Sequence, residues 1–234
     1  MNNVSVVIPS LNEEEFIERC LDAVSRQTLG LVKEIIVADN NSTDTTREIC
    51  RKKDVILVNG GLPAVGRNRG AEEASGEYIL FLDADTIIPE NFLQSSLTLF
   101  EAKSLDVASF FFTPQPLSNW FNVVFGTYNY LAYLASVLQG PFFLTSGCCI
   151  LTKRSCHINV DGFDENIVVL EEYDYIKKIK KNGNFRVLPV AVKTSTRRFT
   201  KTNKWSSVLA LFKCYFKWVF KRKIVDDKYG YWKQ

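Results

Sequence analysis

The stretch Tyr78-Ile79-Leu80-Phe81-Leu82-Asp83-Ala84-Asp85-Thr86 is the part of the sequence around which the rest is arranged. Its five leading apolar residues are typical of a strand that is buried on both faces in a parallel sheet. An unpaired carboxylate is costly to bury, so Asp83 and Asp85 are predicted where this strand leaves the core. Ligands of open α/β folds bind at that edge, and two hard oxygen donors suit Mg²⁺ or Mn²⁺. A solvated Asp-rich turn is the alternative that this stretch alone leaves open.

Strand and helix patterns alternate through residues 1–105, which predicts a mostly parallel sheet flanked by helices. Strands are predicted at Val4–Ile8, Ile35–Val37, Val55–Val58 and Tyr78–Leu82. Helices are predicted from Phe16 to Val24, after a cap at Ser42 or Thr43 through Arg51, from Pro63 to Ala74, and from Pro89 through Phe100.

Each predicted strand end delivers polar residues to the same edge of the sheet. These residues are Glu13, Asp39, Arg67 and the pair Asp83 and Asp85. Any one of them has an ordinary explanation as a helix cap or a solvated turn. Their joint placement on successive strand–helix connections favours a binding site.

The net charge of +3 hides a strong asymmetry along the 234 residues. Residues 1–174 carry 12 Lys and Arg against 24 Asp and Glu, a net charge of −12, whereas residues 175–225 carry 15 Lys and Arg and no acid. Residues 107–152 contain no charged side chain, so an apolar partner is expected to face them. The length suits one domain with a C-terminal appendage.

Two further features bear on the compartment. The N-terminus leads directly into a strand pattern, so no signal peptide is expected. The six cysteines include no CxxC pair, which indicates reduced thiols in a cytoplasmic protein.

Four strings in the first 100 residues resemble signature segments of the family 2 glycosyltransferases. They are Val6–Glu13, Ile36–Thr45, Gly66–Ala71 and Gly76–Thr86, in the family's order and spacing. The resemblance implies an α/β fold of the GT-A nucleotide-diphospho-sugar transferase type. It also implies a GT-A domain over 1–200, with a nucleotide-binding half at 1–105 and an acceptor and catalytic half at 106–200. Residues 201–234 would form a basic, aromatic, amphipathic helical appendage.

The resemblance assigns a nucleotide-sugar donor and a divalent metal to this domain. Asp39 would accept a hydrogen bond from the base, Arg67 would pack beside the base or diphosphate, and Asp83 would contact the ribose and a metal-bound water. Asp85 would bind Mg²⁺ or Mn²⁺ directly, and that cation neutralises the charge of the departing nucleoside diphosphate. The implied nucleotide-sugar set is Pro9, Ser10, Leu11, Asn12, Glu13, Asp39, Asn41, Arg67, Asp83, Ala84, Arg197 and Arg198.

A second group of acids is implied in the acceptor half. Residues 162–165, Gly-Phe-Asp-Glu, resemble the family's Gly-Gly-Phe-Asp-Glu turn, with Asp161 in place of the first glycine. Residues 171–175, Glu-Glu-Tyr-Asp-Tyr, stand where many members read Glu-Asp-x-Asp-Leu. The second acid is the base in inverting members, so Glu172 inherits this role and Glu171 remains a competitor. An acidic helix start that favours the helix dipole is the alternative.

Residues 194–199 resemble a Ser-x-Arg-Arg segment of some members. Arg197 or Arg198 would then help to neutralise the leaving diphosphate through bidentate hydrogen bonds. A solvated basic loop is the alternative.

Two apolar segments predict the kind of acceptor. Residues 205–220 place aromatic and aliphatic residues on one helical face, with Lys213, Lys217 and Lys221 along the opposite edge, as in an interfacial helix. A helix packed on the protein's own core is the alternative. Residues 120–138 are long enough to span a bilayer. A single crossing there would separate Asp85 from Glu172, so a helix lying against the membrane is expected instead.

The resemblance implies an inverting transferase, and the two apolar segments predict a lipid-linked or glycan acceptor. We expect it to lie peripherally on an anionic membrane at the cytoplasmic face and to bind no nucleic acid. Two other functions stay open. A sugar-phosphate nucleotidyltransferase would need a Gly-rich signature after the first strand, which residues 9–13 do not match. A non-catalytic nucleotide-sugar-binding membrane protein would not need the acids Asp83, Asp85, Glu171 and Glu172.

Overall fold

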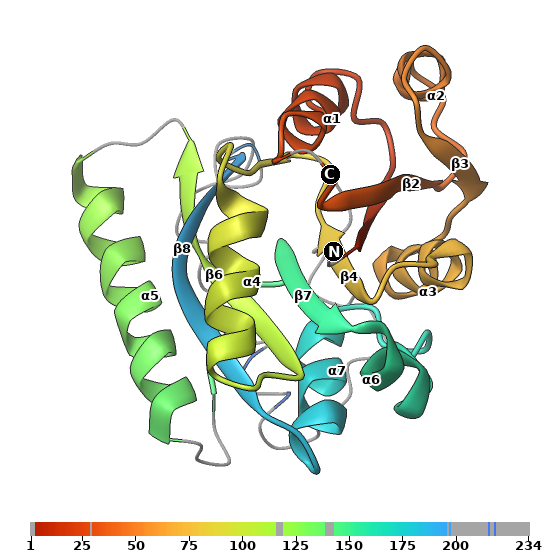
Figure 1. The fold of residues 1–234 in the computed structure, drawn as a ribbon. Helices are drawn as coiled ribbons and strands as arrows, with labels where there is room; N and C mark the ends of the chain where they lie inside the picture. Colours follow the sequence, from red (N-terminus) through yellow and green to blue (C-terminus); the bar gives the residue numbers. More distant parts are fainter. Residues whose placement is uncertain are drawn as a thin grey trace.

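The computed structural model of the chain describes residues 3–28, 30–115, 119–138 and 143–195, together with Arg197, Tyr215 and Trp218. Within this part, one sheet has the strand order β3-β2-β1-β4-β7-β6-β8-β5 (Figure 1). The strands are β1 Val4–Ser10, β2 Val32–Asp39, β3 Ile56–Asn59, β4 Tyr78–Leu82, β5 Thr86–Ile87, β6 Val107–Gln115, β7 Cys149–Lys153 and β8 Phe185–Ser195. The helices are α1 Ile17–Ser25, α2 Thr46–Arg51, α3 Pro63–Glu73, α4 Phe92–Ala102, α5 Asn119–Leu138, α6 Arg154–Asn159 and α7 Glu171–Lys180.

The first half of the sheet is parallel, as the alternating pattern predicts. Strand β1 pairs in parallel with β2 and β4, and β2 pairs in parallel with β3. Strand β7 then runs antiparallel to β4 and β6, while β6 is parallel to β8 and β5 is antiparallel to β8. No strand or helix is predicted from the sequence at β5, β6, β7 or α6. Their segment carries few charges, and no alternation of polar and apolar residues marks its strand faces.

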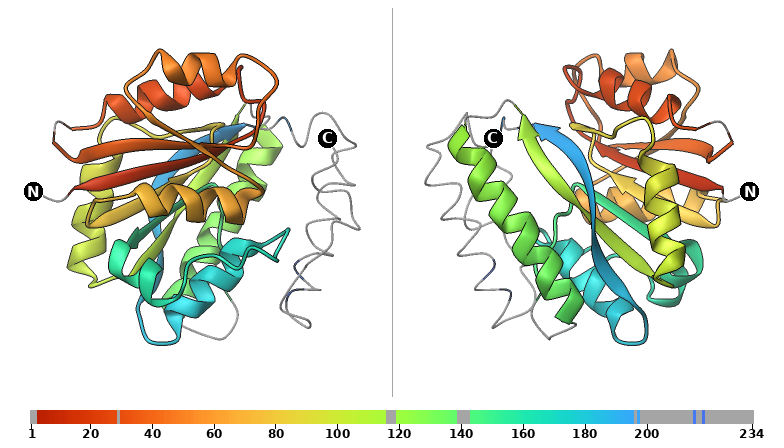
Figure 2. Two further views of the ribbon diagram at one scale, coloured as in Figure 1. Left: turned by 90° about the vertical axis from the view of Figure 1, so that its right-hand side faces the viewer. Right: turned by 60° about the vertical axis from the view of Figure 1, so that its left-hand side comes forward.

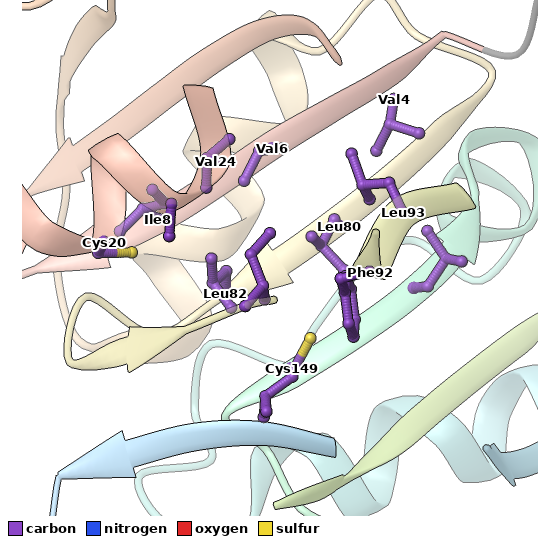
Figure 3. Packing of buried hydrophobic residues seen from close by; sticks show 14 of the residues in the cluster. Val4, Val6, Ile8, Cys20, Val24, Leu80, Leu82, Phe92, Leu93 and Cys149 are labelled. Carbon is purple, nitrogen blue, oxygen red and sulfur yellow. The ribbon is translucent and has the colours of Figure 1, made fainter. Parts of the chain in front are cut away.

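Strand β4 is buried on both faces, which confirms the reading of the opening stretch. Leu80 and Leu82 face one core cluster, with α1 and α4, and Ile79 and Phe81 face the other, with α3 and α7. Figure 3 shows the first cluster, in which Leu80 and Leu82 lie among side chains of β1, α1 and α4. Strand β4 is therefore packed on both faces in the interior of the sheet, between β1 and β7.

Helix α3 lies unusually close to the sheet because two glycines face it. A Cβ atom added to Gly70 would lie 2.3 Å from Cγ1 of Val7, and one added to Gly66 would lie 3.2 Å from Cβ of Pro9. Larger residues would push the helix outward. This close packing places the α3 residue Arg67, between the two glycines, at the carboxyl edge of the strands.

Helix α5 packs against β6 and β8 and leaves its outer face uncovered by the described residues (Figure 2, right). Its 20 residues carry no charge, and Val123, Tyr130 and Leu138 are 68%, 59% and 80% exposed. In the described part of the chain, no helix combines the length and hydrophobicity needed to cross a bilayer.

Most of the C-terminal segment, including Arg198 and the predicted helix over 205–220, lies outside the described residues. Its two described residues pack on the protein's own aromatic side chains. The ring of Trp218 lies 5.0 Å from that of Tyr173 and 5.9 Å from that of Phe143, and Tyr215 lies 5.6 Å from Tyr173. At these two positions the contacts agree with a helix packed on the core. The five described cysteines form no disulfide with one another.

Candidate functional site

Two acids leave the end of β4 together. Asp83 donates its backbone N–H to the carbonyl of Cys148, and its own carbonyl accepts from the N–H of Thr86, at 2.9 Å each. The second bond closes a tight turn between β4 and β5, and the first ties the end of β4 to the segment before β7. The side chain of Asp83 is 30% exposed and that of Asp85 is 11% exposed, so both lie at the margin of the core, as predicted.

Arg67 joins this turn to the start of α7. Its Nη2 donates to Oδ1 of Asp83 at 2.9 Å and to the carbonyl of Gly147 at 3.2 Å, and its Nη1 donates to Oε1 of Glu171 at 2.5 Å. The guanidinium also lies over the ring of Phe163, 5.4 Å from its centroid. The sequence placed Arg67 beside a base or diphosphate. In the structure its guanidinium lies between the acids of the two halves.

Neighbouring carboxylates stabilise the charged form of Arg67 despite its burial. Its side chain is only 3% exposed, and this desolvation lowers the pKa of Arg67. The carboxylates of Asp83, Glu171 and Glu172 outweigh that effect, so the pKa of Arg67 is raised. The guanidinium is therefore a fixed positive charge that holds Asp83 and Glu171 in place.

Glu171 and Glu172 differ sharply in environment. Glu171 is buried and forms the ion pair with Arg67, whereas the ion pairs of the described residues do not include Glu172. The carboxylate of Glu172 lies against Gly147, where an added Cβ atom would be 3.0 Å from Cδ and 3.2 Å from Oε1. Burial raises the pKa of Glu172 to about 8, the charge of Glu171 adds to the rise, and Arg67 opposes it. Glu172 therefore holds its proton more tightly than an ordinary glutamic acid.

The helix that carries these acids begins abruptly. Leu170, just before α7, has the left-handed backbone conformation, with φ of 63° and ψ of 33°. A side chain in this region is uncommon and marks a sharp change of chain direction. That change directs Glu171 toward Arg67 at the first turn of α7.

Arg197 connects the end of β8 to the turn after β4. It donates to Oε1 of Glu13, its Nε lies 3.9 Å from Oδ2 of Asp85, and its guanidinium lies 5.0 Å from the ring centroid of Phe16. Thr194 Oγ1 donates to Oδ1 of Asp85 at 3.4 Å. The structure thus brings together Glu13, Asp85 and Arg197, which lie far apart in the sequence.

The loops after β1 and β2 are joined by reciprocal hydrogen bonds. The N–H of Asn12 donates to Oγ of Ser42 at 2.8 Å, the N–H of Thr43 donates to Oδ1 of Asn12 at 2.9 Å, and the N–H of Glu13 donates to Oγ1 of Thr46 at 2.8 Å. Ser42 and Thr43 take part in this network, α2 begins at Thr46 and its N-cap is Thr45, so the prediction that Ser42 or Thr43 caps this helix was wrong.

The remaining candidate residues lie at or just after the carboxyl ends of β1, β2 and β4. Asn12 and Asn41 have left-handed φ angles of 53° and 54°. Asp39 is buried, and both its carboxylate oxygens accept a hydrogen bond from the N–H of Ser42 at 3.1 Å. Its Oδ1 also forms an ion pair with Nη1 of Arg47 at 3.7 Å. The other members are the buried Ser10 and Ala84, the partly buried Pro9 and the half-exposed Leu11.

The oxygens at the β4–β5 turn fit a hard divalent cation. The carboxylates of Asp83 and Asp85 are hard oxygen donors at the margin of the core, and each is paired with a guanidinium that a cation would have to displace or share. Among the described residues, no three His, Cys, Asp or Glu side chains are grouped to hold a metal by themselves. A metal here would need additional oxygen ligands, such as those of a phosphate.

Sequence reasoning missed Gly147. It lies in the uncharged segment, where neither charge nor periodicity distinguishes one small residue from another. Its role depends on the approach of Glu172, 25 residues later, which only the folded chain reveals. Phe163 belonged to a recognised turn, but its contact with Arg67 was not foreseen.

Comparisons with known proteins agree with this architecture. The family described as Glycosyl transferase family 2 matches residues 5–160. The glycosyltransferase GlyG of Streptococcus pneumoniae serotype 4 is 30% identical over 183 residues, which cover 75% of this chain and 56% of GlyG. The chain therefore spans little more than half the length of GlyG, and less of several other curated relatives.

Solved structures resemble the chain over most of its length. The mannosyltransferase PcManGT of Pyrobaculum calidifontis, in complex with GDP-Man and Mn²⁺, has a TM-score of 0.69 at 22% identity and covers 88% of this chain and 60% of its own. Glucosyl-3-phosphoglycerate synthase of Mycobacterium tuberculosis, in complex with Mn²⁺, UDP and glucosyl-3-phosphoglycerate, has a TM-score of 0.62 at 17% identity. The match covers 97% of this chain and 82% of the synthase chain. At these identities the likeness concerns the fold, and it confirms the GT-A architecture predicted from the sequence.

Proposed function

This chain belongs to glycosyltransferase family 2, and we propose that it moves a sugar from a nucleotide-diphospho-sugar donor to an acceptor hydroxyl or phosphate, with inversion. One observation supports the proposal most. Arg67 binds both Asp83, at the end of the nucleotide-binding half, and Glu171, at the start of α7. The candidate donor acids and the candidate base are thereby held beside one another at the same edge of the sheet.

Different residues of the site take different roles in this proposed reaction. The joined loops after β1 and β2 hold the nucleoside, and Asp85 with Asp83 would hold Mg²⁺ or Mn²⁺. When bound, the cation neutralises the charge that develops on the leaving diphosphate. Glu172 accepts the proton of the acceptor hydroxyl, and its raised pKa makes it a stronger base than an ordinary carboxylate. Arg67 and Glu171 position this base.

The nucleotides in the similar structures suggest which donors to test. PcManGT was solved with GDP-Man and glucosyl-3-phosphoglycerate synthase with UDP, each with Mn²⁺. We expect one UDP-sugar or GDP-sugar to raise the melting temperature of this protein in the presence of Mn²⁺, because a ligand that binds only the folded state stabilises it. The same donor should yield nucleoside diphosphate when an acceptor is added.

Two other outcomes of this screen would point elsewhere. Release of pyrophosphate from a nucleoside triphosphate and a sugar phosphate would favour a nucleotidyltransferase. A donor that binds tightly but yields no nucleoside diphosphate with any acceptor tested would favour a non-catalytic binding protein.

The exposed face of α5 supports a lipid-linked acceptor. A helix of 20 residues is about 30 Å long, and its uncovered apolar residues are Val123, Val124, Tyr130, Leu131, Leu134, Val137 and Leu138. An uncharged apolar face of this length suits a helix that lies in the membrane interface. A peripheral position on the cytoplasmic face would bring a polyprenyl phosphate or glycolipid within reach of the site.

We expect the protein to co-sediment with anionic liposomes and to be released in part at high salt, because salt screens only the electrostatic attraction. Replacing Leu131, Leu134 and Leu138 with serine should reduce sedimentation and leave donor binding unchanged. The matched control is Ile158→Ser on α6, which removes a side chain that is 58% exposed outside this face. A wild-type protein that stays in the supernatant at low salt and glycosylates a soluble acceptor efficiently would contradict the membrane proposal.

A further inference from the structure

Arg197 pairs with Asp85, the acid that the proposed function assigns to the metal. Its guanidinium contacts Glu13 from the loop after β1 and Asp85 from the turn after β4, and it lies over the ring of Phe16. The side chains of Glu13 and Asp85 are each 11% exposed, and that of Arg197 is 26% exposed. Among the described ion pairs, Arg197 is therefore shared by two largely buried carboxylates.

Two buried carboxylates need a nearby positive charge. Each loses most of its hydration on burial, and their like charges disfavour ionisation of both. Arg197 supplies the compensating charge in this structure. A divalent ion that binds Asp85 would supply the same compensation, and it would compete with the guanidinium for the same carboxylate.

Arginine is suited to a change of partner. Its planar guanidinium makes the same paired hydrogen bonds with a carboxylate as with a phosphate group. Arg197 lies two residues after the end of β8 at Ser195. This end lies beside the turn that carries Asp85, because Thr194 pairs with Thr86 across the sheet. A diphosphate bound through a metal at Asp85 would lie close to Arg197.

We propose that Arg197 is the counter-cation of Asp85 in the metal-free protein and exchanges Asp85 for the donor's diphosphate when metal and donor bind. The inference rests on the proposed function, which makes Asp85 a metal ligand. It assigns Arg197 a positioning role in assembling the donor site.

The exchange couples metal binding to nucleotide binding. Metal alone must break the pair between Arg197 and Asp85 without offering the arginine a new partner. A nucleoside diphosphate offers that partner, so each ligand tightens the binding of the other by the same factor. If Arg197 instead stayed in place and only repelled the metal, its removal would tighten metal binding equally with and without nucleotide.

The test is Mn²⁺ binding measured by calorimetry, alone and with saturating UDP or GDP in separate titrations. We expect Arg197→Gln to bind Mn²⁺ alone at least about five-fold tighter than wild type, the lower end of usual coupling between sites. The factor by which the nucleotide tightens Mn²⁺ binding should fall by a similar amount. Arg26→Gln, which removes an equal charge from an exposed position at the end of α1, should match wild type in both.

A second variant, Arg197→Lys, separates the effect of the charge from any loss of structure in Arg197→Gln. Arg197→Lys keeps the charge beside Asp85, so Mn²⁺ alone should bind it as weakly as wild type. Unchanged Mn²⁺ affinity in Arg197→Gln, equal tightening with and without nucleotide, or tight binding of Mn²⁺ alone to Arg197→Lys would each overturn the exchange.

The outcome for wild type separates this inference from the proposed function. A wild-type protein that binds neither UDP nor GDP in the presence of Mn²⁺ contradicts both. A wild-type protein with strong coupling that Arg197→Gln retains contradicts the exchange and leaves glycosyl transfer standing.

Discussion

Asp85→Ala should abolish sugar transfer and the metal-dependent part of donor binding while leaving the fold intact. Asp85 lies at the end of a buried strand with its side chain at the margin of the core, so alanine removes a carboxylate without opening a large cavity. Arg197 keeps Glu13 as a partner in the variant, so no charge is left without compensation. The measurements are nucleoside diphosphate release, donor affinity with and without Mn²⁺, and the melting temperature.

Asp54→Ala is the matched control for this variant. Asp54 is an exposed acid before β3, and its loss should change neither activity nor metal dependence. Full activity of Asp85→Ala in the presence of EDTA would refute the assignment of a metal to this turn.

Glu172→Gln should retain donor binding and lose at least about 10²-fold in kcat, the range for removing a general base. The amide keeps the shape of the side chain beside Gly147 but accepts no proton. In wild type, kcat/KM should rise with pH as Glu172 loses its proton, because only the carboxylate is a base and its pKa is raised. That rise should be absent in Glu172→Gln.

Glu171→Gln is the comparison, because it makes the same chemical change one residue earlier. Its effect on kcat should be milder. Its effect on stability should be larger, because it removes the charge of a buried partner of Arg67. Breaking such a pair costs up to roughly 3–5 kcal/mol, less here because Arg67 keeps Asp83. Thermal unfolding of both variants checks this, and reversed effects on kcat would move the base to Glu171.

The parallel half of the sheet could be predicted because its sequence carries local signals. Five apolar residues before Asp83 can hardly be anything but a buried strand, and the structure buries β4 on both faces. The strand ends were predictable for the same reason, since each polar turn stands directly after an apolar run. The family strings then suggested functions for residues that geometry alone would have left as caps and turns.

The site itself could be predicted only in part, because its key contacts join distant residues. Arg67 and Glu171 are separated by 104 positions, and Arg197 and Glu13 by 184. No local pattern reports which acid of the pair at 171 and 172 binds Arg67. The pairing of Glu171 follows from the left-handed turn at Leu170 and the close packing of α3, which are properties of the folded chain.

The hydrogen bonds between Asn12 and the Ser42–Thr43 segment have a consequence for the entropy of binding. Fixing a loop residue costs about 1–2 kcal/mol of conformational entropy. Here that loss occurs when the chain folds, since side chains of each loop already hold the backbone of the other. A nucleoside that binds beside these two loops would find them already ordered, so less of its contact energy is offset by the entropy cost of immobilising the protein.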